Sequence, residues 1–233
     1  MQITLAIKCP TCLSDRIKKN GINVDGKQNY QCKDCKRRFI GDHVLSYLGC
    51  KSGITRKILQ LMVRGSGIRD IAEVERISIG KVLRTLTEST YEIQPQQSHY
   101  ESLEVDGLWT FVGNKKNKLW LIYAYHRETG EIVAYVWGNR DLATVQQLKT
   151  KLKPSGIHYI RIASDHWDSV ITAFKSCKQS IGQFFTVGIE GNHCKIRHRI
   201  RCSFRRSCNF SKKLESYFKV FDLAFFYINN GFI

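Results

Sequence analysis

The chain has 233 residues and a formal net charge of +17, because 37 lysines and arginines face only 20 acidic residues. Hydrophobic residues make up 42% of it, enough for a packed core, so the composition excludes an intrinsically disordered chain. The apolar runs fall far short of the roughly 20 residues that a membrane-spanning helix needs, and no signal peptide precedes the first cysteine. We therefore expect a cytosolic protein that contacts a polyanion and no membrane.

Residues 1–45 contain two C-x-x-C pairs, Cys9 with Cys12 and Cys32 with Cys35, and 19 residues separate the pairs. Four thiolates at this spacing predict a closed tetrahedral Zn²⁺ site that stabilises a small zinc ribbon and leaves no position for chemistry. The alternative is a disulfide pair or chance spacing. A reducing compartment and the odd total of nine cysteines favour the metal.

Helical periodicity begins after the ribbon. Apolar residues at 54–62 recur on one helical face, glycines interrupt the pattern at 65–67, and a second helix is predicted at 68–74. Ser78 is the expected N-cap of a third helix.

The third helix places Val82 and Leu86 on one side and the basic residues Lys81 and Arg84 on the other. Two short helices joined by a tight turn, the second of them basic, predict a helix-turn-helix domain over residues 50–93 with Lys81 and Arg84 facing DNA. An ordinary helical hairpin that packs on the next domain is the alternative.

The polar segment at residues 94–98 predicts the main domain boundary, and a second domain of α/β class follows over residues 99–233. We expect its elements in the order strand, strand, strand, helix, strand, helix, strand, helix, at residues 103–112, 119–126, 132–137, 143–152, 157–164, 167–177, 184–187 and from about 191 onward. The last of these begins a basic C-terminal helical region.

Three acidic residues lie near the ends of these elements. Alternation along the first strand puts Glu104 and Asp106 on one face and Leu103 and Val105 on the other. Asp165 directly follows the fourth strand and comes close to Asp106 if the first and fourth strands are neighbours. Glu190, near the start of the last helix, would complete the group. This order of strands and acids is that of a ribonuclease-H-like mixed sheet.

Three carboxylates in a basic protein predict a site for Mg²⁺, or Mn²⁺, beside nucleic acid, because hard oxygen ligands suit these ions. Such a site supports phosphoryl transfer. Each acid also has a structural alternative: Asp165 as the N-cap of the next helix, Glu190 as a favourable first-turn charge, and Asp106 as a solvated strand residue.

Residues 191–213 contain no acidic residue. A segment this basic beside the carboxylates predicts phosphate-binding groups, with a solvated charged face as the alternative. Its basic residues are Lys195, Arg197, Arg199, Arg201, Arg205, Arg206, Lys212 and Lys213.

The order of ribbon, helix-turn-helix and Glu104-x-Asp106 resembles the bacterial Insertion Sequence One transposase family over nearly the whole chain. The motifs that carry the resemblance are Val112-Gly113, Trp120-Leu121, Tyr123-Ala124-Tyr125, Val133-Ala134, Gly138-x-Arg140, Asp165-x-Trp167, Ile189-Glu190 and Phe210-Ser211-Lys212. The sequence departs from the family pattern at His166, where glycine is common, and at Asn192-His193, which stand in reverse order.

The resemblance implies a DDE catalytic triad of Asp106, Asp165 and Glu190, with Arg197 as the basic companion seven residues after the glutamate. It also implies cleavage at the terminal inverted repeats of a mobile element, followed by strand transfer into target DNA with Mg²⁺. The partners would be double-stranded DNA, both element ends and target, and further copies of the chain in a synaptic complex at the bacterial nucleoid.

Two other functions remain open from the sequence. One is a zinc-ribbon and helix-turn-helix regulator without catalysis, for which the acids would not matter. The other is a structure-specific, metal-dependent nuclease that cuts without joining. Dependence of cleavage on a divalent metal separates the regulator from the two enzymes, and strand-transfer products separate the nuclease from the transposase.

Overall fold

The computed structural model describes residues 7–23, 26–40, 53–153, 156–203 and 211–233. The chain divides into two compact units, Met1–Ile54 and Thr55–Ile233. Among the described residues, none of the helices combines the length and the apolar character that crossing a bilayer requires.

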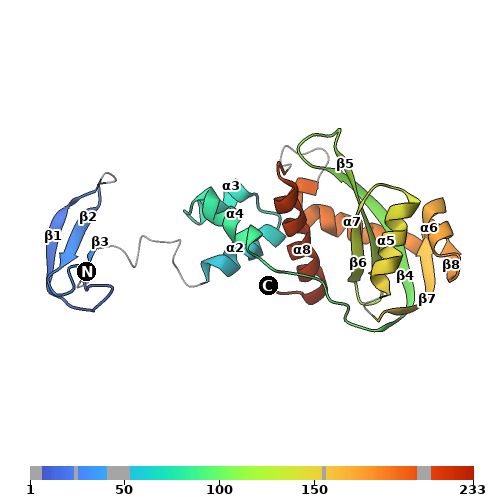
Figure 1. Ribbon diagram of the computed structural model, residues 1–233, viewed down its shortest axis with the longest axis horizontal. Coiled ribbons are helices and arrows are strands. Elements are labelled where there is room, and N and C mark those ends of the chain that lie inside the picture. The colour runs from blue at the N-terminus through green and yellow to red at the C-terminus, as the bar shows by residue number, and fades with distance from the viewer. Residues whose placement is uncertain (1–6, 24–25, 41–52, 154–155, 204–210) are drawn as a thin grey trace. The chain divides into compact units, whose positions relative to one another are not determined.

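The first unit is a three-stranded antiparallel sheet in the order β1-β2-β3, blue in Figure 1. Its strands are β1 (Ile17–Ile22), β2 (Gln28–Cys32) and β3 (Arg38–Ile40). The small core consists of Cys9, Cys32 and Phe39. So little apolar area cannot hold a fold by itself, which is why the four cysteines matter to this unit.

Three helices open the second unit: α2 (Ile54–Val63), α3 (Ile68–Val74) and α4 (Ile79–Thr87), called the helical bundle below. The predicted second helix is confirmed at its expected residues, and so is the N-cap, because the Ser78 hydroxyl accepts a hydrogen bond from the Lys81 amide at 3.1 Å. Residues 94–98, where we expected the main boundary, lie inside the second unit and lead from α4 to the sheet.

A five-stranded mixed sheet follows, in the order β6-β5-β4-β7-β8. Its strands are β4 (His99–Phe111), β5 (Lys118–His126), β6 (Glu131–Gly138), β7 (His158–Ser164) and β8 (Lys178–Ile181). The first three strands form antiparallel hairpins, whereas β7 pairs in parallel with both β4 and β8. The first and fourth strands of this domain are therefore neighbours, which is the condition under which Asp165 was expected to come close to Asp106.

Helices cover both faces of the sheet. Helices α5 (Leu142–Leu152) and α6 (Asp168–Ala173) pack on the face that carries Leu103 and Val105. Helices α7 (Val187–Arg199) and α8 (Leu214–Asn230) pack on the opposite face. Glu104 and Asp106 therefore belong to the α7 side, as the alternation predicted.

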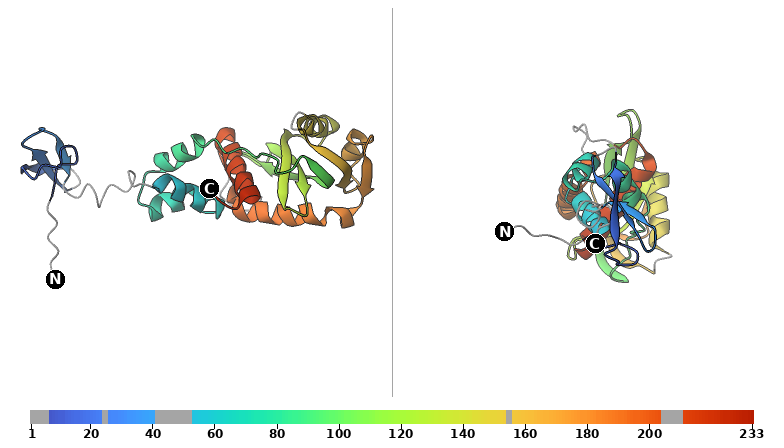
Figure 2. Two further views of the ribbon diagram at one scale, coloured as in Figure 1. Left: turned by 90° about the horizontal axis from the view of Figure 1, so that it is seen from below. Right: turned by 90° about the vertical axis from the view of Figure 1, so that its left-hand side faces the viewer.

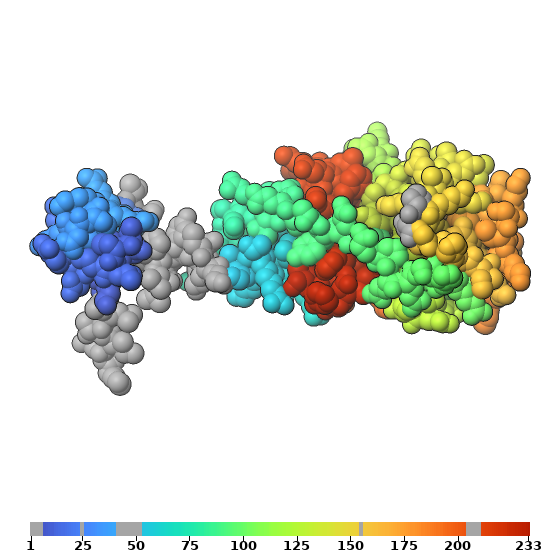
Figure 3. Space-filling view, turned by 60° about the horizontal axis from the view of Figure 1, so that its bottom comes forward, coloured from blue at the N-terminus to red at the C-terminus, as the bar shows by residue number. Residues whose placement is uncertain are grey.

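Helix α8 also contacts the helical bundle through α4. In Figure 3 the red surface of α8 lies beside the cyan and green surface of the bundle. The expectation of basic C-terminal helices fits α7 but not α8, whose buried residues include Tyr217, Phe221 and Phe225. Helix α8 is an aromatic core element.

Two predicted elements are wrong. The last strand is β8, not residues 184–187, which belong to a 3₁₀ turn (Gln183–Thr186) and the start of α7. The apolar residues around Phe184 led to the prediction of a strand, but Phe184 itself is 78% exposed, so this segment does not pack as a core strand. The helix expected at 167–177 spans only Asp168–Ala173; residues 174–177 form a turn that leads into β8, which pairs with β7.

Candidate active site and metal centre

Asp106 and Asp165 lie next to each other at the edge where β4 and β7 diverge. The two strands pair with a constant offset of 59 residues, from His99 with His158 to Glu104 with Ala163. The same offset matches position 106 with position 165. Since paired strands are about 4.8 Å apart, the two carboxylates leave adjacent backbones.

Asp106 is mostly enclosed. The pKa of this carboxyl is raised to about 6, chiefly by burial and also by the negative charges of Asp165 and Glu190, against the lowering effects of the Gly107 amide and the Arg140 guanidinium. One oxygen, Oδ1, accepts a hydrogen bond from the Gly107 amide at 2.6 Å. Asp106 therefore feels both other predicted acids, which excludes the interpretation of a solvated strand residue.

Asp165 is not a helix cap. Helix α6 begins at Asp168 with Trp167 as its N-cap residue, so the capping alternative for Asp165 is wrong. Its Oδ1 is buried and has no hydrogen-bond partner in the part of the chain that the structure describes, while Oδ2 lies 3.9 Å from Arg140 Nη2. A buried carboxylate oxygen without a partner is costly, and an added cation would satisfy it.

Glu190 lies in the first turn of α7 and is exposed. The Thr186 hydroxyl donates a long hydrogen bond of 3.4 Å to its Oε1. Among the described residues, only the four cysteines form a group of three or more potential metal ligands whose donor atoms all lie within 4.8 Å of one another. The structure thus brings Asp106 and Asp165 together and leaves Glu190 beside them, turned toward Thr186.

Glu104 fixes the start of α7. Its carboxylate accepts hydrogen bonds from the Ile189 amide at 2.6 Å and from Arg127 Nε at 2.5 Å, and the residue is only 4% exposed. A Cβ atom at Gly188 would come within 2.8 Å of Glu104 Oε1, so glycine lets the helix approach this closely. Glu104 holds the backbone of α7 next to Glu190.

Two further residues of α7 share the face of Glu190. His193 Nδ1 lies 3.8 Å from Asp106 Oδ2, and burial, followed by the charge of Arg197, lowers the pKa of His193 to about 4. The imidazole is therefore neutral at neutral pH. Arg197 is half-buried and lies seven residues after Glu190, about 10 Å along the helix axis.

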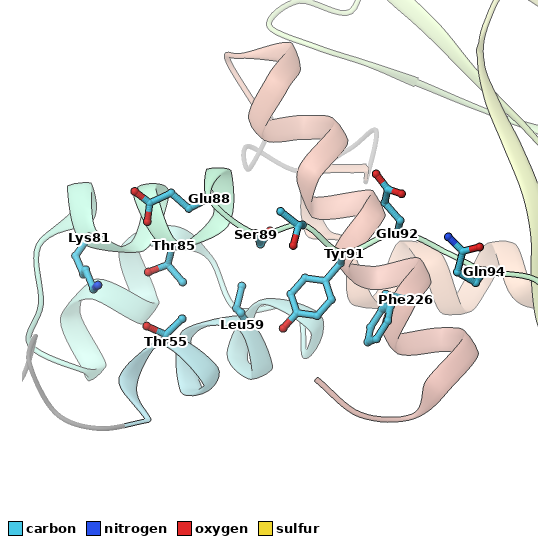
Figure 4. Close-up of a pocket in the computed structure, with 11 residues that line it drawn as sticks. Thr55, Leu59, Lys81, Thr85, Glu88, Ser89, Tyr91, Glu92, Gln94 and Phe226 are labelled. Carbon is cyan, nitrogen blue, oxygen red and sulfur yellow. The ribbon is translucent and has the colours of Figure 1, made fainter.

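The basic residues predicted to face DNA have different surroundings. Lys195 and Arg84 are exposed, and Lys81 lines a hollow of about 640 Å³ with residues of α2, the 88–94 segment and α8 (Figure 4). Arg201 is also exposed. Arg205 and Arg206 lie outside the described residues.

Arg199 makes contacts inside the protein. Its Nη1 donates to the Val63 carbonyl of α2 at 3.2 Å, and its guanidinium lies 4.6 Å from the Tyr227 ring of α8. A Cβ atom at Gly65 would come within 2.9 Å of the His198 carbonyl. The C-terminal ends of α2 and α7 therefore meet on α8, and Figure 2 shows α7, in orange, running from the sheet toward the bundle.

The four cysteines of the first unit form one cluster, with all four sulfurs within 4.8 Å of one another. The Cys9 and Cys35 sulfurs are 3.4 Å apart, and those of Cys12 and Cys32 are 3.6 Å apart. Sulfurs around a tetrahedral zinc ion with Zn–S bonds of about 2.3 Å are about 3.8 Å apart. The cluster therefore fits Zn²⁺.

Backbone geometry favours the thiolate form of two of the four cysteines, Cys9 and Cys32, whereas burial and the neighbouring cysteines raise the pKa of Cys12 to about 12. Each C-x-x-C loop turns through a residue with left-handed φ, Leu13 at 56° and Lys36 at 59°. The amide of Cys12 is the main cause that lowers the pKa of Cys9 to about 6, and the amide of Cys35 lowers the pKa of Cys32 in the same way. Thiolates are the form that binds zinc.

Comparison with known proteins gives the family. A profile described as IS1 transposase matches residues 101–230, and one described as InsA N-terminal domain, a zinc ribbon, matches residues 3–36. The insertion element iso-IS1n protein InsB of Shigella dysenteriae is 37% identical over 117 residues, 50% of this chain and 88% of that protein. The insertion element IS1 2 protein InsB of Escherichia coli strain K12 is 32% identical over 131 residues, 56% of this chain and 77% of that protein.

The chain belongs to the IS1 transposase family, and its function is that of a transposase. Among solved structures, a chain from the simian T-cell lymphotropic virus intasome in complex with the PP2A regulatory subunit B56 gamma matches with a TM-score of 0.38 and 9% identity. The match covers 71% of this chain and 64% of that one. A likeness this distant says nothing further about this protein.

Sequence reasoning assigned no role to several residues around the carboxylates. Arg140 and Trp167 entered only as parts of the family motifs, and Arg127 and Gly188 carried no local signal at all. Their importance depends on contacts between residues far apart in the chain, such as Arg127 with Glu104. The local sequence gave one indication that could have been used: Trp167 lies two residues after Asp165, which suggests that it packs near the carboxylates.

Proposed function

We propose that this transposase binds the terminal inverted repeats of its mobile element and catalyses metal-dependent strand cleavage and strand transfer with Asp106, Asp165 and Glu190. The observation that carries the proposal is the closeness of Asp106, on β4, to Asp165, directly after the neighbouring strand β7, whose negative charge raises the pKa of Asp106. Among the described residues, one buried oxygen of Asp165 has no hydrogen-bond partner. Mg²⁺ or Mn²⁺ fits this donor set because the ligands are hard, anionic and mutually repulsive.

The fold supports the same proposal. The strand order β6-β5-β4-β7-β8, with three antiparallel hairpin strands and two parallel ones, is the order expected of a ribonuclease-H-like sheet. Asp106 lies on β4, Asp165 directly after β7, and Glu190 in the first turn of α7. We propose the ribbon at 1–45 and the helices at 50–93, the latter as a helix-turn-helix, as the readers of the element ends. Cleavage at two ends requires a synaptic complex of several copies.

In this mechanism the protein supplies geometry and charge. Asp106 and Asp165 hold fixed positions on the sheet, and Glu190 leaves its weak contact with Thr186 by side-chain rotation and turns toward them. A divalent metal pair, when bound, stabilises the attacking and leaving oxygens of an in-line displacement. Neutral His193 lies against Asp106 and adds no positive charge that would compete with the cation.

The test is cleavage of a duplex that carries one element end, in the presence of Mg²⁺. Asp106→Asn, Asp165→Asn and Glu190→Gln should each slow strand cleavage by about a thousandfold or more, because a few kcal/mol of metal-dependent stabilisation is lost at about 1.4 kcal/mol per tenfold. Binding of the same duplex, measured by gel shift in EDTA with zinc retained, should change little.

Asp168→Asn is the matched control, since Asp168 is an exposed carboxylate three residues from Asp165. It should cleave at the wild-type rate. Full activity of any of the three variants removes that residue from the proposed triad. Wild-type cleavage without strand-transfer products would point to a nuclease instead.

A further inference from the structure

A second charged feature faces Asp165 from the side opposite to α7. Arg140 lies in the short segment between β6 and α5, and its guanidinium carbon is 5.3 Å from the Trp120 ring and 4.8 Å from the Trp167 ring. One guanidinium group therefore lies over both indole rings. Such stacks hold a planar cation strongly because the ring faces are electron-rich.

Residues around the two rings and Arg140 favour this arrangement. A Cβ atom at Gly107 would lie 3.2 Å from Trp120 and 3.4 Å from Trp167, so the absence of a side chain on β4 gives the two rings their room. The backbone after Arg140 is fixed as well, because the Asp141 carboxylate caps α5 by accepting from the Thr144 amide at 2.9 Å. Neither the ring pair nor the backbone lets Arg140 turn away easily.

The guanidinium nevertheless keeps an open edge. The Arg140 side chain is 45% exposed, and its contact with Asp165 Oδ2, at 3.9 Å, is too long for a hydrogen bond. A guanidinium that lies over aromatic rings can still offer its N–H groups to a planar or tetrahedral anion. Asp165 is therefore a neighbour of this edge and does not saturate it.

We propose that Arg140, which lies over the Trp120 and Trp167 rings, binds a phosphate of the cleaved DNA strand, either the scissile phosphate or one immediately beside it. This inference rests on the proposed function, since the carboxylates define where the scissile phosphate lies. Arg140 acts from the α5 side of the sheet while Glu190 acts from the α7 side, so the strand would be held between them. The two tryptophans are positioning residues that fix the plane of the guanidinium.

The experiment pairs protein variants with modified DNA. Duplexes with one element end carry a single methylphosphonate, which removes one negative charge, at the scissile phosphate or at either of the two phosphates on each side. Cleavage rates are measured at saturating Mg²⁺ for the wild type, Arg140→Ala and Arg140→Lys. The exposed arginine of β7, in Arg161→Ala, is the matched control.

On unmodified DNA, Arg140→Ala should slow cleavage by about 10- to 100-fold, as expected for one charge-assisted hydrogen bond, while Arg140→Lys recovers part of the rate. At one methylphosphonate position, the modification should lower the cleavage rate of the wild type by a similar factor. The same modification should lower the rate of Arg140→Ala by less than about twofold relative to its rate on unmodified DNA. Such non-additivity identifies the phosphate that the guanidinium contacts. Arg161→Ala should behave as the wild type on every duplex.

An equal Arg140→Ala penalty on all modified duplexes would overturn the proposal, and so would a wild-type rate for this variant. Trp120→Phe is a second variant for this test, and it should fold because Trp120 is only partly buried. It should lower the cleavage rate less than Arg140→Ala does and show the same non-additivity at the same phosphate. If Asp106→Asn still cleaves, the triad fails, yet the phosphate scan still reports whether Arg140 faces the strand. The two failures are therefore distinguishable.

Discussion

Glu104 and Asp106 are two residues apart on the same face of β4, yet their surroundings differ. Glu104 is fully enclosed by Arg127 and the start of α7, whereas Asp106 faces Asp165. Alternation along the strand predicted the shared face but could not choose between the two acids, because the choice depends on contacts with distant residues. The position of Asp106 was predictable from the alternation along its strand, and that of Asp165 from the end of the strand before it.

At this scale we predict that Glu104→Gln weakens both the fold and catalysis. The amide still accepts from Ile189 but no longer pairs its charge with Arg127, so unfolding should become easier by about 1–2 kcal/mol, seen as a lower midpoint in thermal unfolding. Cleavage should fall at least tenfold at ordinary Mg²⁺ and recover partly at higher Mg²⁺, because Glu190 is less well placed.

The matched control is Glu101→Gln, an exposed glutamate of the same strand, which should leave both quantities unchanged. A Glu104→Gln protein that is less stable but cleaves normally, at every Mg²⁺ concentration, would show that Glu104 has no influence on Glu190.

Among the elements, α7 illustrates what periodicity cannot predict. We expected its start near residue 191, but it begins at Val187, since the carboxylate of Glu104 accepts the Ile189 amide in the first turn. A cap supplied by a strand 85 residues earlier leaves no trace in the local sequence. The hairpin strands β4 to β6 were predictable to within a few residues because glycine-containing turns separate clear alternating segments.

Two basic residues of α7, Arg199 and Lys195, should have different roles that experiments can distinguish. Arg199→Ala removes the contacts with Val63 and Tyr227 and should expose the amides of α2 to faster hydrogen exchange, with about 1–2 kcal/mol of local stability lost. Lys195→Ala, at an exposed position, should leave exchange unchanged but reduce the salt dependence of DNA binding by about one unit of slope. The reverse pattern would assign Arg199 to the DNA and Lys195 to the fold.

On the scale of the whole molecule, the chain combines a unit whose core is too small to stand alone with a unit whose sheet carries an apolar core on each face. The cysteine spacing predicted the first unit because metal ligation has a sequence signature. Loss of the zinc site should therefore affect one unit and spare the other.

We predict that Cys32→Ser, or zinc removal by a chelator, unfolds the ribbon and weakens specific binding to the element ends by at least tenfold. The second unit should keep its cooperative thermal transition, measured by circular dichroism, and its protease-resistant fragment should begin near residue 55. Unchanged affinity for the element ends after zinc loss would show that the ribbon does not read DNA.

Helix α7 is one continuous rod that starts beside the carboxylates and ends against α2. Glu190 and Arg199 are nine residues apart, about 14 Å along the axis. Because the helix is rigid over this length, a tilt of about 10° at the bundle end displaces the end near Glu190 by about 2 Å. Errors of about 1 Å in the position of a reacting group can lower the rate about a hundredfold. If the bundle binds the element ends, as proposed, the way it docks on DNA would also set the position of Glu190 relative to Asp106 and Asp165.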